Sequence, residues 1–69
     1  MSKIEIIVNG KNIQIEQNST IEQLLIERNV TGKMFVVEKN KKIIQKQDYD
    51  KEFLKNGDSI EIAGFFGGG

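Results

Sequence analysis

Two short runs of alternating apolar and polar residues meet at an Asn-Gly pair, and this arrangement constrains the fold more than any other part of the sequence. Residues 3–8 (KIEIIV) and 12–16 (NIQIE) flank Asn9-Gly10. Side chains of a strand point alternately to its two faces, and a two-residue type I′ turn needs the positive φ angles that Asn and Gly tolerate. We therefore expect a β-hairpin whose apolar face comprises Ile4, Ile6, Val8, Ile13 and Ile15.

The segment after the hairpin has the signals of a short amphipathic helix. Thr20 and Gln23 have the spacing of a capping box, in which each residue's side chain bonds the other's backbone. Asn29 can take the left-handed conformation that ends many helices, so we expect about three turns. The apolar stripe, at the spacing of one helix face, consists of Ile21, Leu24 and Leu25.

The second half of the chain predicts three further strands. Residues 34–38 are rich in strand formers, and a turn at 39–42 leads to a short return strand, Ile43-Ile44. From Gln45 to Lys55 the chain is polar, and we expect a long connection with one short helical turn, anchored only by Tyr49, Phe53 and Leu54, of which Tyr49 is partly buried. After the turn Asn56-Gly57-Asp58, residues 59–62 form a last strand, for which the centre of the sheet is the obvious place.

These elements predict one α+β domain over residues 1–66, a mixed sheet of four or five strands with one helix packed across one face. Because 69 residues without cysteine bury a limited core, the packed core alone must stabilise the fold. The absence of both cysteine and histidine removes thiol nucleophiles, imidazole bases and the usual zinc ligands. We expect a carrier or binder with no metal site rather than an enzyme.

Charge and hydropathy narrow the class of partners. Ten basic and ten acidic residues give a formal net charge of zero, which argues against nucleic acid, since nucleic-acid-binding domains are usually basic. No apolar stretch approaches the roughly 20 residues of a membrane span. The first residues pass directly into a strand pattern and do not resemble a signal peptide. Without cysteines to oxidise, the cytoplasm is the expected compartment.

The chain finishes on Gly67-Gly68-Gly69, after an apolar run. A glycine segment has no Cβ atoms and can take almost any φ and ψ, so it can thread into a narrow pocket and present a terminal carboxylate. Ordinary terminal disorder is the competing interpretation. We expect this tail, residues 67–69, to be mobile in the free protein.

Several segments together resemble the ThiS family, the sulfur carrier proteins of thiamin (thiazole) biosynthesis. They are Val8-Asn9-Gly10, Thr20–Leu25, Val36–Asn40, Gly57–Ile62 and Phe65-Phe66-Gly67-Gly68-Gly69, in family order and spacing. The resemblance covers essentially the whole chain and implies a ubiquitin-like β-grasp fold. One departure is the stretch Ile43-Ile44-Gln45-Lys46, where family members often have Pro-Arg after the apolar pair. Without the proline, the path of the following loop and some partner contacts there are open.

The resemblance also implies an activity and its partners. A ThiF-like adenylating enzyme, using ATP and Mg²⁺, would activate the carboxylate of Gly69, and Gly68 would precede the reacting group. A persulfide sulfur donor would convert the acyl-adenylate into a thiocarboxylate. A ThiG-like thiazole synthase would then receive the sulfur. No cofactor is expected on the carrier itself.

Two other functions remain open at this level. A related carrier with the same chemistry could serve another client, such as the molybdopterin synthase small-subunit type or a protein modifier. A passive β-grasp interaction module with incidental glycines is the other alternative. Phe65 and Phe66, with Gly67, are candidate partner contacts, and we expect one of the two rings to be exposed. Two charged groups are expected mainly as solvated surface, with partner recognition as the minority interpretation: Lys39, Lys41, Lys42 and Lys46, and Asp48, Asp50, Glu52, Asp58 and Glu61.

Overall fold

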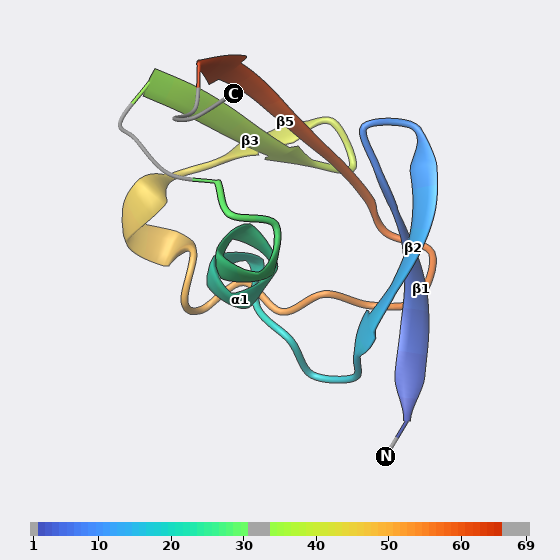
Figure 1. Cartoon of the computed structure of the whole chain (residues 1–69). Coiled ribbons are helices and arrows are strands. Elements are labelled where there is room, and N and C mark those ends of the chain that lie inside the picture. Colours follow the sequence, from blue (N-terminus) through green and yellow to red (C-terminus); the bar gives the residue numbers. More distant parts are fainter. Residues whose placement is uncertain (1, 31–33, 66–69) are drawn as a thin grey trace.

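The protein folds into a single twisted sheet with one helix against one face (Figure 1). The computed structural model describes residues 2–30 and 34–65. The strand order is β2-β1-β5-β3-β4, so the last strand is central, as expected. β1 and β5 are parallel and the other pairs are antiparallel. The elements are β1 (Lys3–Val8), β2 (Lys11–Glu16), α1 (Ile21–Glu27), β3 (Met34–Lys39), β4 (Lys42–Ile44), the 3-10 helix η1 (Lys46–Asp48) and β5 (Ser59–Phe65).

Both hairpins turn through two residues with positive φ. Asn9 and Gly10 have φ of 50° and 84°, which confirms the turn predicted from the Asn-Gly pair. The second turn is tighter than the predicted 39–42, because β3 runs through Lys39 and β4 starts at Lys42. Its central residues are Asn40 and Lys41, with φ of 52° and 71°. Lysine is not a typical residue for this conformation, so sequence pattern did not place the turn there.

The helix begins with the predicted capping box. The Gln23 backbone nitrogen donates to Thr20 Oγ1 at 3.2 Å, and the Thr20 nitrogen donates to Gln23 Oε1 at 2.9 Å. α1 ends at Glu27, so it is nearer two turns than the predicted three. Asn29 has a φ of 58° and confirms the left-handed termination.

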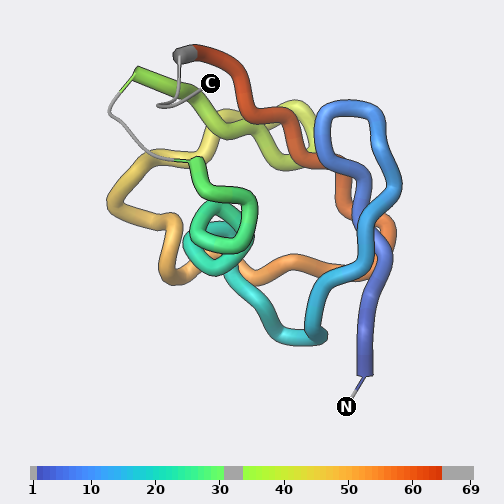
Figure 2. Tube along the Cα trace, in the orientation of Figure 1, coloured from blue at the N-terminus to red at the C-terminus, as the bar shows by residue number. Residues whose placement is uncertain are grey.

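The core lies between α1 and the inner face of the sheet. Fully buried side chains come from four strands and from the helix, and Leu54 of the β4–β5 connection joins them as expected. Phe53, also expected as an anchor of that connection, is instead 52% exposed. That connection passes α1 on its way to β5 (Figure 2). Two backbone hydrogen bonds hold it there: the Ile21 nitrogen donates to the Glu52 carbonyl at 3.0 Å, and the Leu54 nitrogen donates to the Ser19 carbonyl at 2.8 Å. The buried apolar residues are Ile6, Val8, Ile15, Ile21, Leu24, Leu25, Val37, Leu54, Ile60 and Ile62.

Candidate functional site

β5, the central strand of the sheet, leads to the C-terminal glycines, and we call its end at Phe65 the exit. β5 runs to Phe65, beyond the Ile62 expected from alternation, and its last residues pair with the beginning of β3, Phe65 with Met34 and Gly64 with Phe35. Of the predicted site residues, Phe65 therefore lies at the end of β5. Residues 66–69 lie outside the described residues, and the expectation of a mobile tail lies there with them. The expectation that one of the Phe65 and Phe66 rings is exposed also falls outside what is described of these side chains.

Gly64 fixes the way in which the chain reaches this exit. Its φ is +130°, which L side chains rarely adopt, and a Cβ there would meet the Met34 carbonyl oxygen and lie 2.7 Å from the Phe35 Cα. These are backbone atoms of the neighbouring strand and cannot move aside as a flexible side chain could. Glycine at this position is therefore required both by the backbone conformation and by the close approach of β3.

Two turn asparagines hold β5 from opposite sides. Asn9 lies on the β1 side, where its backbone nitrogen donates to the Ile60 carbonyl and its side chain bonds the backbone of Ile62. Asn40 lies on the β3 side, where its nitrogen donates to the Ser59 carbonyl at 2.7 Å and its Oδ1 accepts from the Ser59 nitrogen at 2.9 Å. The strand that carries the glycine segment is thus pinned at both flanks.

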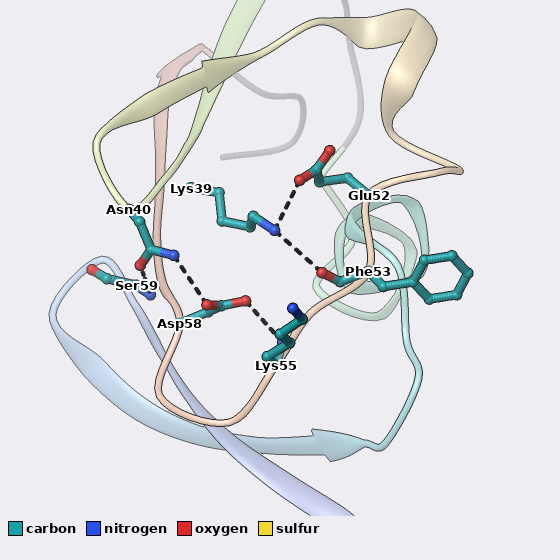
Figure 3. A network of polar contacts seen from close by, with 7 residues as sticks. All are labelled: Lys39, Asn40, Glu52, Phe53, Lys55, Asp58 and Ser59. Carbon is teal, nitrogen blue, oxygen red and sulfur yellow. Dashed lines mark hydrogen bonds and ion pairs between the residues drawn. The ribbon is translucent and has the colours of Figure 1, made fainter.

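A polar network holds the segment that enters β5 (Figure 3). Lys39 Nζ forms an ion pair with Glu52 Oε2 at 2.8 Å and donates to the Phe53 carbonyl at 3.3 Å. Asp58 accepts from Asn40 Nδ2 at 3.0 Å and from the Lys55 nitrogen at 2.8 Å. The expectation of solvated surface was wrong for Lys39, whose side chain is only 17% exposed. Glu52 and Asp58 likewise form contacts within the fold, and Asp58 lies in the turn expected at Asn56-Gly57-Asp58.

The outer face of the sheet beside this exit exposes several apolar side chains. Strand register puts Val36 opposite Ala63, while Val37, one residue along, is buried against the helix side. Met34 is 74% and Ile43 62% exposed. We call Met34, Val36, Ile43 and Ala63 the open-face patch. Sequence reasoning missed it, although strand alternation places the apolar residues 34 and 36 on one face and could have indicated it.

A hollow of about 250 Å³ adjoins the open-face patch at the edge formed by β4 and η1. The rings of Phe35 and Tyr49 stack in its wall, with centroids 6.3 Å apart and planes 17° from parallel. Burial raises the pKa of the Tyr49 hydroxyl above its ordinary value, and the ring is the half-buried anchor that the sequence predicted. Gln45 and Lys46, where the chain departs from the Pro-Arg pattern, line the same hollow.

Metal binding and membrane spanning both lack support in the described part of the chain. Residues 2–30 and 34–65 contain no group of three or more acidic, histidine or cysteine side chains that could hold a metal ion. Of the helices in these ranges, none combines the length and apolar character needed to cross a membrane. The features that remain are an exit from a rigid central strand and an open apolar face next to it, which suit contact with another protein.

Comparison with known proteins gives a consistent match. The sequence model of the ThiS family matches residues 3–69. The chain is 40% identical over 63 residues to the sulfur carrier protein ThiS of Bacillus subtilis (strain 168), covering 90% of this chain and 96% of that protein. A crystal structure of the thiamine biosynthesis protein ThiS from Geobacter metallireducens superposes with a TM-score of 0.81 at 28% identity, covering 96% of this chain and all of that one.

A second kind of relative is much longer. The chain is 33% identical over 66 residues to a thiazole synthase of Paramagnetospirillum magneticum and 32% identical to one of Magnetococcus marinus. It spans about a fifth of the length of these two proteins, and 96% of its own length is matched. The similarity thus concerns one segment of each thiazole synthase.

Proposed function

The chain belongs to the ThiS family, and we propose that it works as the sulfur carrier of thiamin biosynthesis, holding sulfur on the carboxyl group of Gly69. It has the β-grasp fold of its structural neighbour and is a carrier rather than an enzyme. The observation that carries the proposal is the family match, which runs from the first strand through Gly69. The match covers the glycine segment as well as the domain.

The proposed chemistry activates the carboxylate and then exchanges one oxygen for sulfur. A carboxylate oxygen attacks the α-phosphorus of ATP on the adenylating enzyme, which forms an acyl-adenylate and releases pyrophosphate. The terminal sulfur of a persulfide then attacks the acyl carbon and expels AMP, and reduction of the remaining S–S bond by a thiol frees the thiocarboxylate. The sulfur stays on the backbone terminus, so the carrier needs no cysteine of its own, and the sequence has none.

The fold supports this role by joining a glycine segment to a fixed strand. Gly68 and Gly69 lack side chains that would crowd the carbonyl in a narrow channel, while β5 is hydrogen-bonded to strands on both sides. The open-face patch lies where a partner would contact the domain while the segment enters its active site. Exposed apolar surface of this kind often marks a protein interface, and Phe65 and Phe66 are the contacts proposed nearest the tail.

Thiazole synthase is the proposed recipient, because proteins of that name contain a segment similar to this chain. A ThiF-like adenylating enzyme with MgATP and a persulfide donor complete the proposed set of partners. Since activation consumes ATP, we place the reaction in the cytoplasm.

The proposal is tested by intact mass spectrometry after incubation with the adenylating enzyme, MgATP and a persulfide source. We expect the mass to rise by the difference between sulfur and oxygen, localised to Gly69 by fragmentation. A folded protein that shows no such rise, with its C-terminus unblocked, would contradict the carrier chemistry and favour a passive module.

Two variants serve as controls. Gly69→Ala should cripple the transfer while leaving the thermal midpoint unchanged, because the added methyl group crowds the reacting carbonyl. Deletion of Gly68 and Gly69 should abolish the mass change, whereas a passive module would keep its partner affinity and its biological role.

A further inference from the structure

A row of three side chains crosses the open face, one each from β4, β3 and β5. Glu38 of β3 lies opposite Ile43 of β4 and opposite Glu61 of β5. Directly opposed residues have Cβ atoms about 4.5–5.5 Å apart, and like charges in this position destabilise a sheet. Glu61 is exposed and Glu38 half-buried. Neither carboxylate forms an ion pair with a described basic residue.

The surroundings of this pair favour a cation supplied by another protein. The pair borders the open-face patch, and Ile43 at the end of the row also lines the hollow. A protein covering the patch would exclude water from the carboxylates, and their attraction to a cation grows as the effective dielectric constant falls. The planar guanidinium of arginine has five donors in a fixed fork and can bond two carboxylates at once, whereas lysine offers a compact point charge.

The hollow indicates what lies next to that cation. Its volume of about 250 Å³ is below the usual range for small-molecule sites and is of a size for one large apolar side chain. Phe35 and Tyr49 provide stacked aromatic walls. The residues that contribute most to binding at protein interfaces cluster in well-packed, desolvated pockets near the centre and are enriched in Trp, Tyr and Arg.

We propose that Glu38 and Glu61 together bind one arginine of the thiazole synthase partner, next to a large apolar side chain of the same protein in the hollow. This inference rests on the proposed function. Thiazole synthase is chosen over the adenylating enzyme because a segment similar to this chain occurs within proteins of that name. The acidic pair then acts in partner selection, since a partner without the arginine would leave two opposed carboxylates buried and unpaired.

The test measures the affinity of the full chain for the thiazole synthase of the same organism, by calorimetry at low and moderate salt. Glu38→Gln and Glu61→Gln should each weaken binding about tenfold or more, as expected for a truncated interfacial charge pair. The double variant should lose much less affinity than the product of the two single-variant losses, because one arginine binds both carboxylates. Neither substitution should lower the thermal midpoint of the free protein, since each removes a repulsion.

Glu27→Gln is the matched control, because it removes the same charge from an exposed residue of α1, against the other face of the sheet. Binding by Glu38→Gln and Glu61→Gln within about twofold of the original, where truncation should cost much more, would overturn the inference. So would an equal loss with Glu27→Gln, or a loss confined to the adenylating enzyme. The mass-spectrometric assay on the original chain from the same preparation keeps the two proposals apart. Thiocarboxylate formation would support the proposed function whatever the binding result, and its absence would count against that function separately.

Discussion

The side chain of Asn9 completes the pairing between β1 and β5 at Ile62, beyond the point where β1 turns away. Asn9 Oδ1 accepts from the Ile62 nitrogen at 2.8 Å, and Asn9 Nδ2 donates to the Ile62 carbonyl at 3.2 Å. An amide side chain thus makes both hydrogen bonds that a strand residue would make. The residue that turns the first hairpin also holds the central strand.

Replacing Asn9 should therefore cost more than an ordinary turn substitution. We expect Asn9→Ala to lower the free energy of unfolding by about 2–3 kcal/mol, from two hydrogen bonds of about 1 kcal/mol each and the strain of a left-handed alanine. Urea denaturation measures this change. Asn9→Gly keeps the backbone conformation and should lose the hydrogen-bond part alone. If the Asn9→Gly variant were as stable as the original protein, the amide would contribute nothing.

Gly64→Ala should destabilise the protein by about 1–3 kcal/mol, the range for a strained backbone position. The added Cβ meets backbone atoms of Met34 and Phe35. Gly10→Ala is the matched comparison, because Gly10 also has positive φ, of 84°, but a Cβ there meets nothing within 4 Å. Thermal and urea denaturation of both variants separate conformational strain from steric conflict, and equal effects would mean that the approach of β3 to Gly64 is unimportant.

The ion pair between Lys39 and Glu52 should contribute more than the one between Lys3 and Glu16. The Lys39 and Glu52 side chains are 17% and 33% exposed, whereas those of Lys3 and Glu16 are 53% and 51% exposed, with a longer separation of 3.6 Å. We expect Lys39→Met to lower the free energy of unfolding by about 1 kcal/mol and Lys3→Met by at most a few tenths, because exposed pairs are well screened. Denaturation at two salt concentrations checks this ranking, and the reverse order would refute it.

The stability of the protein should fall at high pH in a way that depends on Tyr49. Burial raises the pKa of its hydroxyl above the ordinary 10.0. The folded state therefore holds the proton more tightly than the unfolded state, and the stabilisation is complete below pH 10.0 and is lost as pH rises through the folded pKa. The difference in unfolding free energy between the original protein and Tyr49→Phe, followed from neutral to alkaline pH, should shrink or reverse accordingly. A constant difference would contradict the assignment.

Local signals were sufficient for most of the fold. The Asn9-Gly10 turn and the Thr20–Gln23 capping box each depend on a few neighbouring residues, so the local sequence pattern predicted both. The short helical turn after β4 and the central last strand were also as expected. The differences arise where tertiary contacts override local preference. Lys41 takes a left-handed conformation because strand pairing continues to Lys39 and Lys42.

The site was less accessible to sequence reasoning. Gly64 lay beyond the strand predicted at residues 59–62, and its positive φ and its approach to β3 depend on which strand lies beside it. Lys39 looked like part of a charged turn, since its partner Glu52 lies in a connection whose path no local pattern fixes. The opposed carboxylates of Glu38 and Glu61 required the register of β3 and β5. The roles proposed for Phe66 and Gly67–Gly69 stay predictions.

The central position of β5 also has a mechanical consequence. Because β1 and β5 run parallel, tension applied beyond Phe65 and resisted at the start of β1 loads the hydrogen bonds between these strands in shear, all at once, and does not peel them one at a time. The antiparallel ladder to β3 and the Asn9 side chain share that load. In the function proposed for this chain, a partner that draws in or releases the glycine segment therefore pulls on the central strand, and the load is spread over its hydrogen bonds to both neighbouring strands.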